Sequence, residues 1–141
     1  MCRGWLGGLT ALIIIAGYVP GRTGSSLLTI VEARRIVNEA LPKETKRLPG
    51  LTLWLSKEDQ AHPPRCLTFD ILWSNPGPGS VHVGFWSVDR RSGEVWMPLE
   101  CRRVTNSALT KLQQEIRKRL GVSNEEWHEA LKHNPCCRPD R

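Results

Sequence analysis

The sequence predicts an α+β domain: an N-terminal helix packed on a three- or four-stranded antiparallel meander, followed by two C-terminal helices. Three observations lead to this prediction. Apolar residues recur at helical spacing in residues 28–41, alternate with polar residues in short segments of residues 51–97, and return to helical spacing after residue 105. Because a sheet with one apolar face needs a cover, we expect the first helix to lie on that face.

An apolar leader comes before the domain, in residues 1–24. Arg3 precedes an apolar run of about 15 residues, the pattern of a secretory signal. The run is shorter than the ~20 residues that a membrane-spanning helix needs, so we expect cleavage, with an uncleaved anchor as the alternative. The leader predicts an exported protein, periplasmic or secreted, whose single domain spans residues 25–141 and which contacts a membrane only if the leader is retained.

The first helix is expected to begin at a capping box. In this box the hydroxyl of Thr29 and the carboxylate of Glu32 satisfy nearby backbone donors. The apolar residues that follow share one helix face: Ala33, Ile36, Val37, Ala40 and Leu41. Pro42 ends the helix, because proline cannot continue it.

Strand-like alternation recurs four times, within a predicted sheet core of residues 28–100. The segments are Leu51–Leu55, Leu67–Trp73, Val81–Val88 and Glu94–Met97. Residues 75–79 are proline and glycine after an asparagine, so they connect two strands. Asp89 to Gly93 has the pattern of a type I turn closed by a left-handed glycine, which predicts a hairpin.

Helical spacing returns in residues 105–135. One predicted face carries Leu109, Leu112, Ile116 and Leu120. Gly121 suits the C-cap of this helix. A second capping box, from Ser123 to Glu126, begins a further short helix.

Four cysteines lie in the predicted domain: Cys66, Cys101, Cys136 and Cys137. An even number in an oxidising compartment predicts disulfides, with three pairings open. We expect Cys66 to pair with Cys101, since this bridge would tie two sheet segments together. The neighbours Cys136 and Cys137 are hard to join to each other, so one of them pairs elsewhere, or between two copies in a disulfide-linked dimer.

No catalytic apparatus, cofactor or metal is expected. Four residues near the C-terminus have types that suit zinc but match no closed-site spacing: His128, His133, Cys136 and Cys137. A nucleophilic Cys66 beside His82 is an enzyme-like alternative with no recognisable motif around it. The net charge of +6 comes from basic residues interspersed with acids, which indicates solvated helix surfaces rather than a nucleic-acid partner.

Candidate binding residues come from the aromatic side chains and the hairpin. By the alternation, Trp54 and Trp86 lie opposite the main apolar face, where exposed rings would anchor a protein or glycan partner. The alternative is that the C-terminal helices cover this side and bury both rings. The hairpin offers a second contact through Asp89, Arg90 and Arg91.

Two segments resemble PepSY domains. Residues 28–37 resemble that family's opening helix with its Glu-Ala pair, and residues 83–96 resemble its closing hairpin, where a strand runs into Val-Asp-x-x-Thr-Gly-x-Val. The resemblance covers residues 28–97. It departs from the family at Ser92, where threonine is usual, and in the helical part after Cys101. It implies an exported, non-catalytic module of the kind proposed to restrain a peptidase.

We therefore predict a non-catalytic protein-binding or inhibitory module that acts on a protein partner in the cell envelope. A periplasmic immunity or antitoxin-type protein is the alternative, because such proteins share the helix-plus-meander plan. A small metal- or thiol-dependent enzyme is a further alternative.

Overall fold

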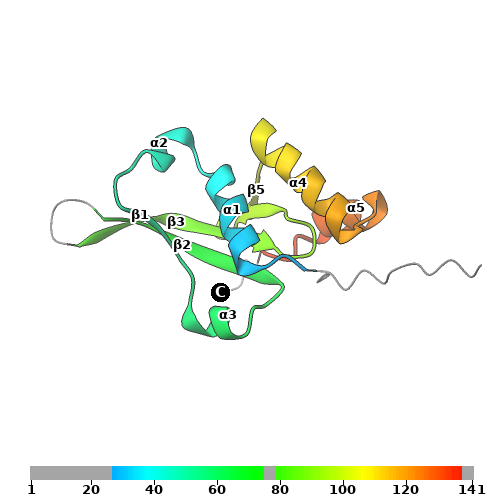
Figure 1. Ribbon diagram of the computed structural model, residues 1–141, viewed down its shortest axis with the longest axis horizontal. Helices are drawn as coiled ribbons and strands as arrows, with labels where there is room; N and C mark the ends of the chain where they lie inside the picture. The colour runs from blue at the N-terminus through cyan, green and yellow to red at the C-terminus, as the bar shows by residue number, and fades with distance from the viewer. Residues whose placement is uncertain (1–26, 75–78, 138–141) are drawn as a thin grey trace, which may run out of the picture.

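A five-stranded antiparallel sheet in the order β1-β2-β3-β4-β5 forms the centre of the molecule (Figure 1). The computed structural model describes residues 27–74 and 79–137. The strands are β1 (Leu51–Trp54), β2 (Cys66–Ser74), β3 (Ser80–Asp89), β4 (Val95–Met97) and β5 (Arg102–Val104). The helices are α1 (Ile30–Ala40), α2 (Lys43–Lys46), α3 (Lys57–Ala61), α4 (Ser107–Leu120) and α5 (Asn124–His133).

The predicted α+β architecture is confirmed: an N-terminal helix, an antiparallel meander and two C-terminal helices occur in the expected order. The sequence analysis did not identify β5 or the short helices α2 and α3. The predicted leader, residues 1–24, lies outside the described residues, as do residues 75–78 of the predicted connection between strands. Within the described part of the chain, every helix is too short or too polar to cross a bilayer.

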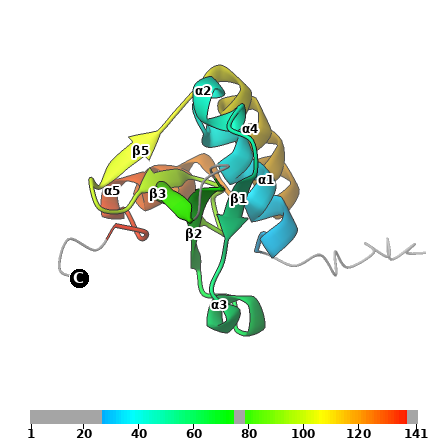
Figure 2. The same ribbon diagram turned by 90° about the vertical axis from the view of Figure 1, so that its left-hand side faces the viewer.

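Helices α1 and α4 lie side by side on one face of the sheet (Figures 1 and 2). The capping box at the start of α1 is formed as expected, with Thr29 and Glu32 bonded reciprocally. The packed side chains of this layer are fully buried or nearly so: Ala33, Ile36, Val37, Leu67, Phe69, Ile71, Val88, Val95, Leu109 and Ile116. This helix-covered face is the hydrophobic core that the alternation predicts.

The hairpin after β3 lies beneath both helices. Gly93 has a φ of +75°, and a Cβ at this position would lie 3.6–3.7 Å from methyl groups of Ile36 in α1 and Ile116 in α4. The predicted left-handed glycine is therefore present. Its position also lets the turn fit closely under the helix pair.

A bulge in β3 reverses the predicted sidedness of this strand. The register shifts between Ile71 and Leu72 of β2, which pair with Gly84 and His82, so that Val83 is the extra residue. Beyond the bulge, Trp86 is opposite Phe69 on the helix-covered face, and it is only 5% exposed. The ring of Trp86 lies over Gly84, where an added Cβ would approach it to 2.9 Å. A one-residue insertion exchanges the faces of all later side chains, which is why alternation alone placed Trp86 on the wrong side.

The disulfides join the C-terminal tail, residues 134–137 after α5, to the sheet. Cys66 pairs with Cys136 and Cys101 pairs with Cys137, with Cα atoms 5.5 and 5.2 Å apart. The expected Cys66–Cys101 bridge is wrong, because at least β3 and β4 separate β2 from the turn that holds Cys101, and strands spaced at ~4.8 Å exceed the reach of a disulfide. Both tail cysteines are bonded within the chain, which leaves no thiol among the described residues for the predicted link between copies.

Candidate functional site

The face of the sheet opposite α1 and α4, here called the open face, carries the most accessible aromatic surface in the sheet. Strand register places Trp54, Asp70 and Phe85 in one row across β1, β2 and β3, and places Leu72 and His82 in the next row. Figures 1 and 2 show the short helix α3 beyond this side of β1 and β2. The side chain of Trp54 is 51% exposed, so the open face presents a large ring to solvent.

A polar pair lies beside these rings. Nε2 of His82 is 3.0 Å from Oδ1 of Asp70, within ion-pair distance although not aligned as a hydrogen bond. The His82 ring also contacts Phe85, with centroids 4.5 Å apart. The exposed end of the open face thus combines apolar rings with one acid and one imidazole, a composition suited to protein recognition.

The other end of the open face is covered. The row formed by Thr68, Ser87 and Trp96 includes a 2.7 Å hydrogen bond between the two hydroxyls, and both Ser87 and Trp96 are buried. Cys66 also belongs to this face by its register, so its disulfide draws the tail across the start of β2. This half of the open face is therefore buried, with the tail bonded at its edge, whereas the half around Trp54 is exposed in the part of the chain that the structure describes.

A groove of about 860 Å³ runs along the boundary between these halves. Its floor includes Thr68 and Phe85, and α3 contributes Glu58 and Asp59 to one wall. The β4–β5 turn and the tail also line the groove, through Pro98, Leu99, Pro135 and Cys136. Leu99 is 80% exposed. A concave site with apolar walls and a few polar groups is the usual form of a binding site.

The hairpin residues predicted to bind a partner make contacts within the chain. Asp89 is fully buried and accepts two hydrogen bonds from Arg65, at 3.0 and 3.2 Å, and one from Ser92. The hydrogen bond from Arg65 to Asp89 raises the pKa of the guanidinium. Arg90 donates to the carbonyls of Leu28 and Pro63. These contacts fix the turn against the residues just before α1 and the loop before β2.

Arg91, the third hairpin candidate, is exposed and forms an ion pair with Glu126 of α5 at 2.6 Å. It is therefore the hairpin residue with the most accessible charge. Of the two candidate tryptophans, the structure leaves Trp54 on the surface and buries Trp86.

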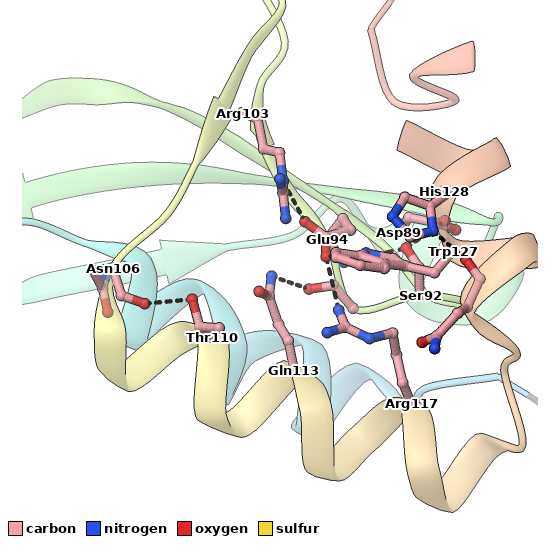
Figure 3. A network of polar contacts seen from close by, with 12 residues as sticks. Asp89, Ser92, Glu94, Arg103, Asn106, Thr110, Gln113, Arg117, Trp127 and His128 are labelled. Atoms are coloured by element: carbon pink, nitrogen blue, oxygen red, sulfur yellow. Dashed lines mark hydrogen bonds and ion pairs between the residues drawn. The ribbon is translucent and has the colours of Figure 1, made fainter. Parts of the chain in front are cut away.

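A second polar network surrounds the buried carboxylate of Glu94. Figure 3 shows Arg103, Arg117 and Trp127 directed at this group, with donor–acceptor distances of 2.7, 2.9 and 2.7 Å. Desolvation by burial lowers the pKa of Arg117, although its ion pair with Glu94 opposes the change. Glu94 connects β5, α4 and α5, so the network's role is to fix the two C-terminal helices on the sheet.

The residues considered for zinc or thiol chemistry are not brought together. The tail cysteines are oxidised, and His133 bonds to Glu129 on its own helix. His82 faces Asp70, and Cys66 is bonded to Cys136. Among residues 27–74 and 79–137, no three His, Cys, Asp or Glu side chains are arranged to hold a metal ion.

The free edge of β1 offers a further groove of about 470 Å³, against α1. Val31, which lines it, is 78% exposed. The guanidinium of Arg34 donates to the carbonyl of Leu53, however, and so occupies an edge group that an added strand would use. The open face is the better candidate site.

Several residues of the open face were missed by the sequence analysis: Glu58, Asp59, Asp70, Phe85 and Leu99. The alternation of β2 places Asp70 opposite Leu67, Phe69 and Ile71, and this signal was available. The position of Phe85 depends on the bulge, and the groove depends on the path of the tail. Neither leaves a local pattern in the sequence.

The fold is similar to that of a chain in the structure of a type VI secretion system effector-immunity complex from Pseudomonas protegens. The TM-score is 0.62 at 22% sequence identity, and the match covers 84% of this chain and 98% of that chain. The likeness shows a shared fold. No protein-family model and no curated protein matches the sequence, so the resemblance to PepSY domains stays a prediction.

Proposed function

We propose that this chain is an immunity-type protein, which binds a toxic effector protein through the open face of its sheet and neutralises it. The observation that carries this proposal is the shared fold with a chain of an effector-immunity complex, which covers nearly all of that chain. The exposed ring of Trp54 supports it, because tryptophan is enriched among the residues that dominate protein–protein affinity.

An effector-immunity complex contains a toxic effector and an immunity protein. The bonding of the carboxylates and cysteines in this chain favours the immunity protein. The buried carboxylates of Asp89 and Glu94 are saturated by arginine, serine and tryptophan donors, and all four described cysteines are in disulfides. These carboxylates and thiols, which an enzyme could use for proton transfer or nucleophilic attack, are thus committed to holding the fold. The effector itself is the second candidate function.

The disulfides and the leader support a proposal for the compartment. Two disulfides in one small domain fit an oxidising environment, and the apolar leader fits export. We propose that the protein acts in the periplasm, against an effector delivered there. The PepSY-like inhibitory module is a related proposal that would also use a protein-binding surface, with a peptidase as the partner.

Co-production tests the proposed function. Each effector domain encoded in the genome that carries this chain is directed to the periplasm of a test bacterium, alone and together with the chain. We expect one effector that stops growth alone, permits growth with the chain, and elutes with it as a complex in size-exclusion chromatography. Growth arrest by the chain alone would favour the effector role. Failure to neutralise or bind any of these effectors would contradict the proposal.

A further inference from the structure

We propose that the groove between α3 and the C-terminal tail binds a basic segment of the partner protein, and that this segment presents an arginine side chain. The inference rests on the proposed function and names the chemistry of the partner at one place on the open face. The groove lies next to the exposed aromatic row, since Phe85 belongs to both. One partner surface can therefore contact Trp54 and enter the groove together.

The charge of the groove lining favours a cationic occupant. Glu58 and Asp59 line the groove, and neither side chain has a hydrogen bond or ion pair with another described residue. Arg65, the cation among the described residues that line the groove, is held by the buried carboxylate of Asp89 through two hydrogen bonds. Among the described residues, two carboxylates consequently remain unneutralised at the groove, in a chain whose net charge is +6. A cationic occupant complements them.

The other surfaces of the groove favour arginine over lysine. Phe85 provides a half-buried aromatic ring, and Pro98, Leu99 and Pro135 provide apolar walls. A guanidinium stacks on an aromatic ring and binds carboxylates with two parallel hydrogen bonds, while its aliphatic stem packs on apolar surface. An ammonium group is more strongly hydrated and makes single contacts, so it fits this lining less well.

Two disulfides fix one wall of the groove before binding. Cys136 in one wall is bonded to Cys66 beside the floor, and Cys137 next to it is bonded to Cys101 at the β4–β5 turn. The tail is thus fixed at two adjacent residues to two different parts of the sheet. A wall fixed in this way loses little conformational entropy when a ligand enters, which increases affinity for a given set of contacts.

Titration with short peptides tests the groove without the effector. The protein, labelled with ¹⁵N and purified from an oxidising compartment, is titrated by NMR with three capped tripeptides, Gly-Arg-Gly, Gly-Lys-Gly and Gly-Glu-Gly. We expect the arginine peptide to shift the amide signals of Glu58, Asp59, Phe85 and Leu99. The lysine peptide should bind more weakly, and the glutamate peptide should leave these signals unchanged.

A charge-neutral double variant, Glu58→Gln with Asp59→Asn, supplies the control. It should bind the arginine peptide about fivefold more weakly, as expected for the loss of two ion pairs near the surface, and its remaining spectrum should show an intact fold. The variant Glu115→Gln, on α4 outside the groove lining, should bind like the parent. Peptide shifts that are absent, or that persist with equal affinity in the double variant, would overturn the inference. Since no effector is present, this result is independent of whether the immunity function holds.

Discussion

The two faces of the sheet are stabilised in different ways. The helix-covered face is sealed by apolar side chains of α1 and α4 around Phe69 and Ile71, which are fully buried. The open face has one short helix and a tail held by two disulfides, and it leaves Trp54 exposed. If the open face binds the partner as proposed, stability and recognition are separated between the buried residues of the first face and the exposed residues of the second. Substitutions of the buried residues should act on folding, and substitutions of the exposed residues should act on binding.

The largest expected difference between the faces is in the free energy of unfolding. Phe69→Ala removes a fully buried ring from the helix-covered face and should lower the free energy of unfolding by about 4 kcal/mol. Trp54→Ala, on the open face, should lower it by less than about 1 kcal/mol. Urea denaturation of both variants checks this, and equal losses would show that Trp54 is part of the core.

Removal of one disulfide should destabilise the tail side of the open face. Cys66 and Cys136 are 70 residues apart in the sequence, and the loss of their bond through Cys66→Ser with Cys136→Ser should cost about 4 kcal/mol in the chain-entropy estimate. The tail wall of the groove would also lose one of its two anchors. Chemical denaturation of the variant gives the energy, and an unchanged midpoint would contradict the role assigned to this bond.

The polar network around Glu94 stabilises the fold through ion pairs, as the apolar side chains stabilise the helix-covered face by burial. Glu94→Gln removes the charge that pairs with Arg103 and Arg117 while keeping a group of similar size. Because two partially buried cations would lose their counter-ion, we expect a loss of about 3 kcal/mol in unfolding free energy. The matched variant Glu100→Gln, in an exposed pair with Arg102, should change it by less than about 1 kcal/mol. Equal effects of the two variants would refute a structural role for the network.

The smallest effect is expected at the start of α1. Partial burial favours a higher pKa for Glu32, but hydrogen bonds from Thr29 and the ion pair with Arg119 outweigh it, so the net pKa is lowered. A lowered folded-state pKa means that this stabilisation is present above the unfolded-state pKa and is lost as the pH falls through the folded-state value, below about pH 4. Glu32→Gln should therefore be less stable than the parent at pH 7, by less than about 1 kcal/mol, and equal to it near pH 2. A constant difference at both pH values would contradict this.

The helix-covered face could largely be predicted from the sequence, whereas the open face could not. Apolar spacing in α1, α4 and β2 reports directly on burial, and it located Ala33, Ile36, Phe69 and Ile71 correctly. The bulge at Val83 cannot be recognised from the sequence, because the alternation of side chains in β3 continues across it without interruption. Cysteine pairing depends on where the tail crosses the sheet.

Short polar elements were missed for a related reason. Strand β5 has only three residues, two of them arginines, and α3 contains five residues with a single apolar one. Neither has the periodicity that identifies an element from sequence. Since α3 and the tail form the groove, the candidate site is built largely from segments whose structure is set by tertiary contacts rather than by local pattern.

A comparison of two exposed apolar side chains on opposite faces tests the central claim most directly. With the effector identified by co-production, its Kd is measured by calorimetry for the parent, for Trp54→Ala on the open face and for Val31→Ala on α1. If the open face binds the effector, Trp54→Ala should weaken binding by about thirtyfold, as for a dominant interface residue, and Val31→Ala should leave the Kd unchanged. Unchanged affinity in Trp54→Ala together with weakened affinity in Val31→Ala would place the interface on the helical side and contradict the account.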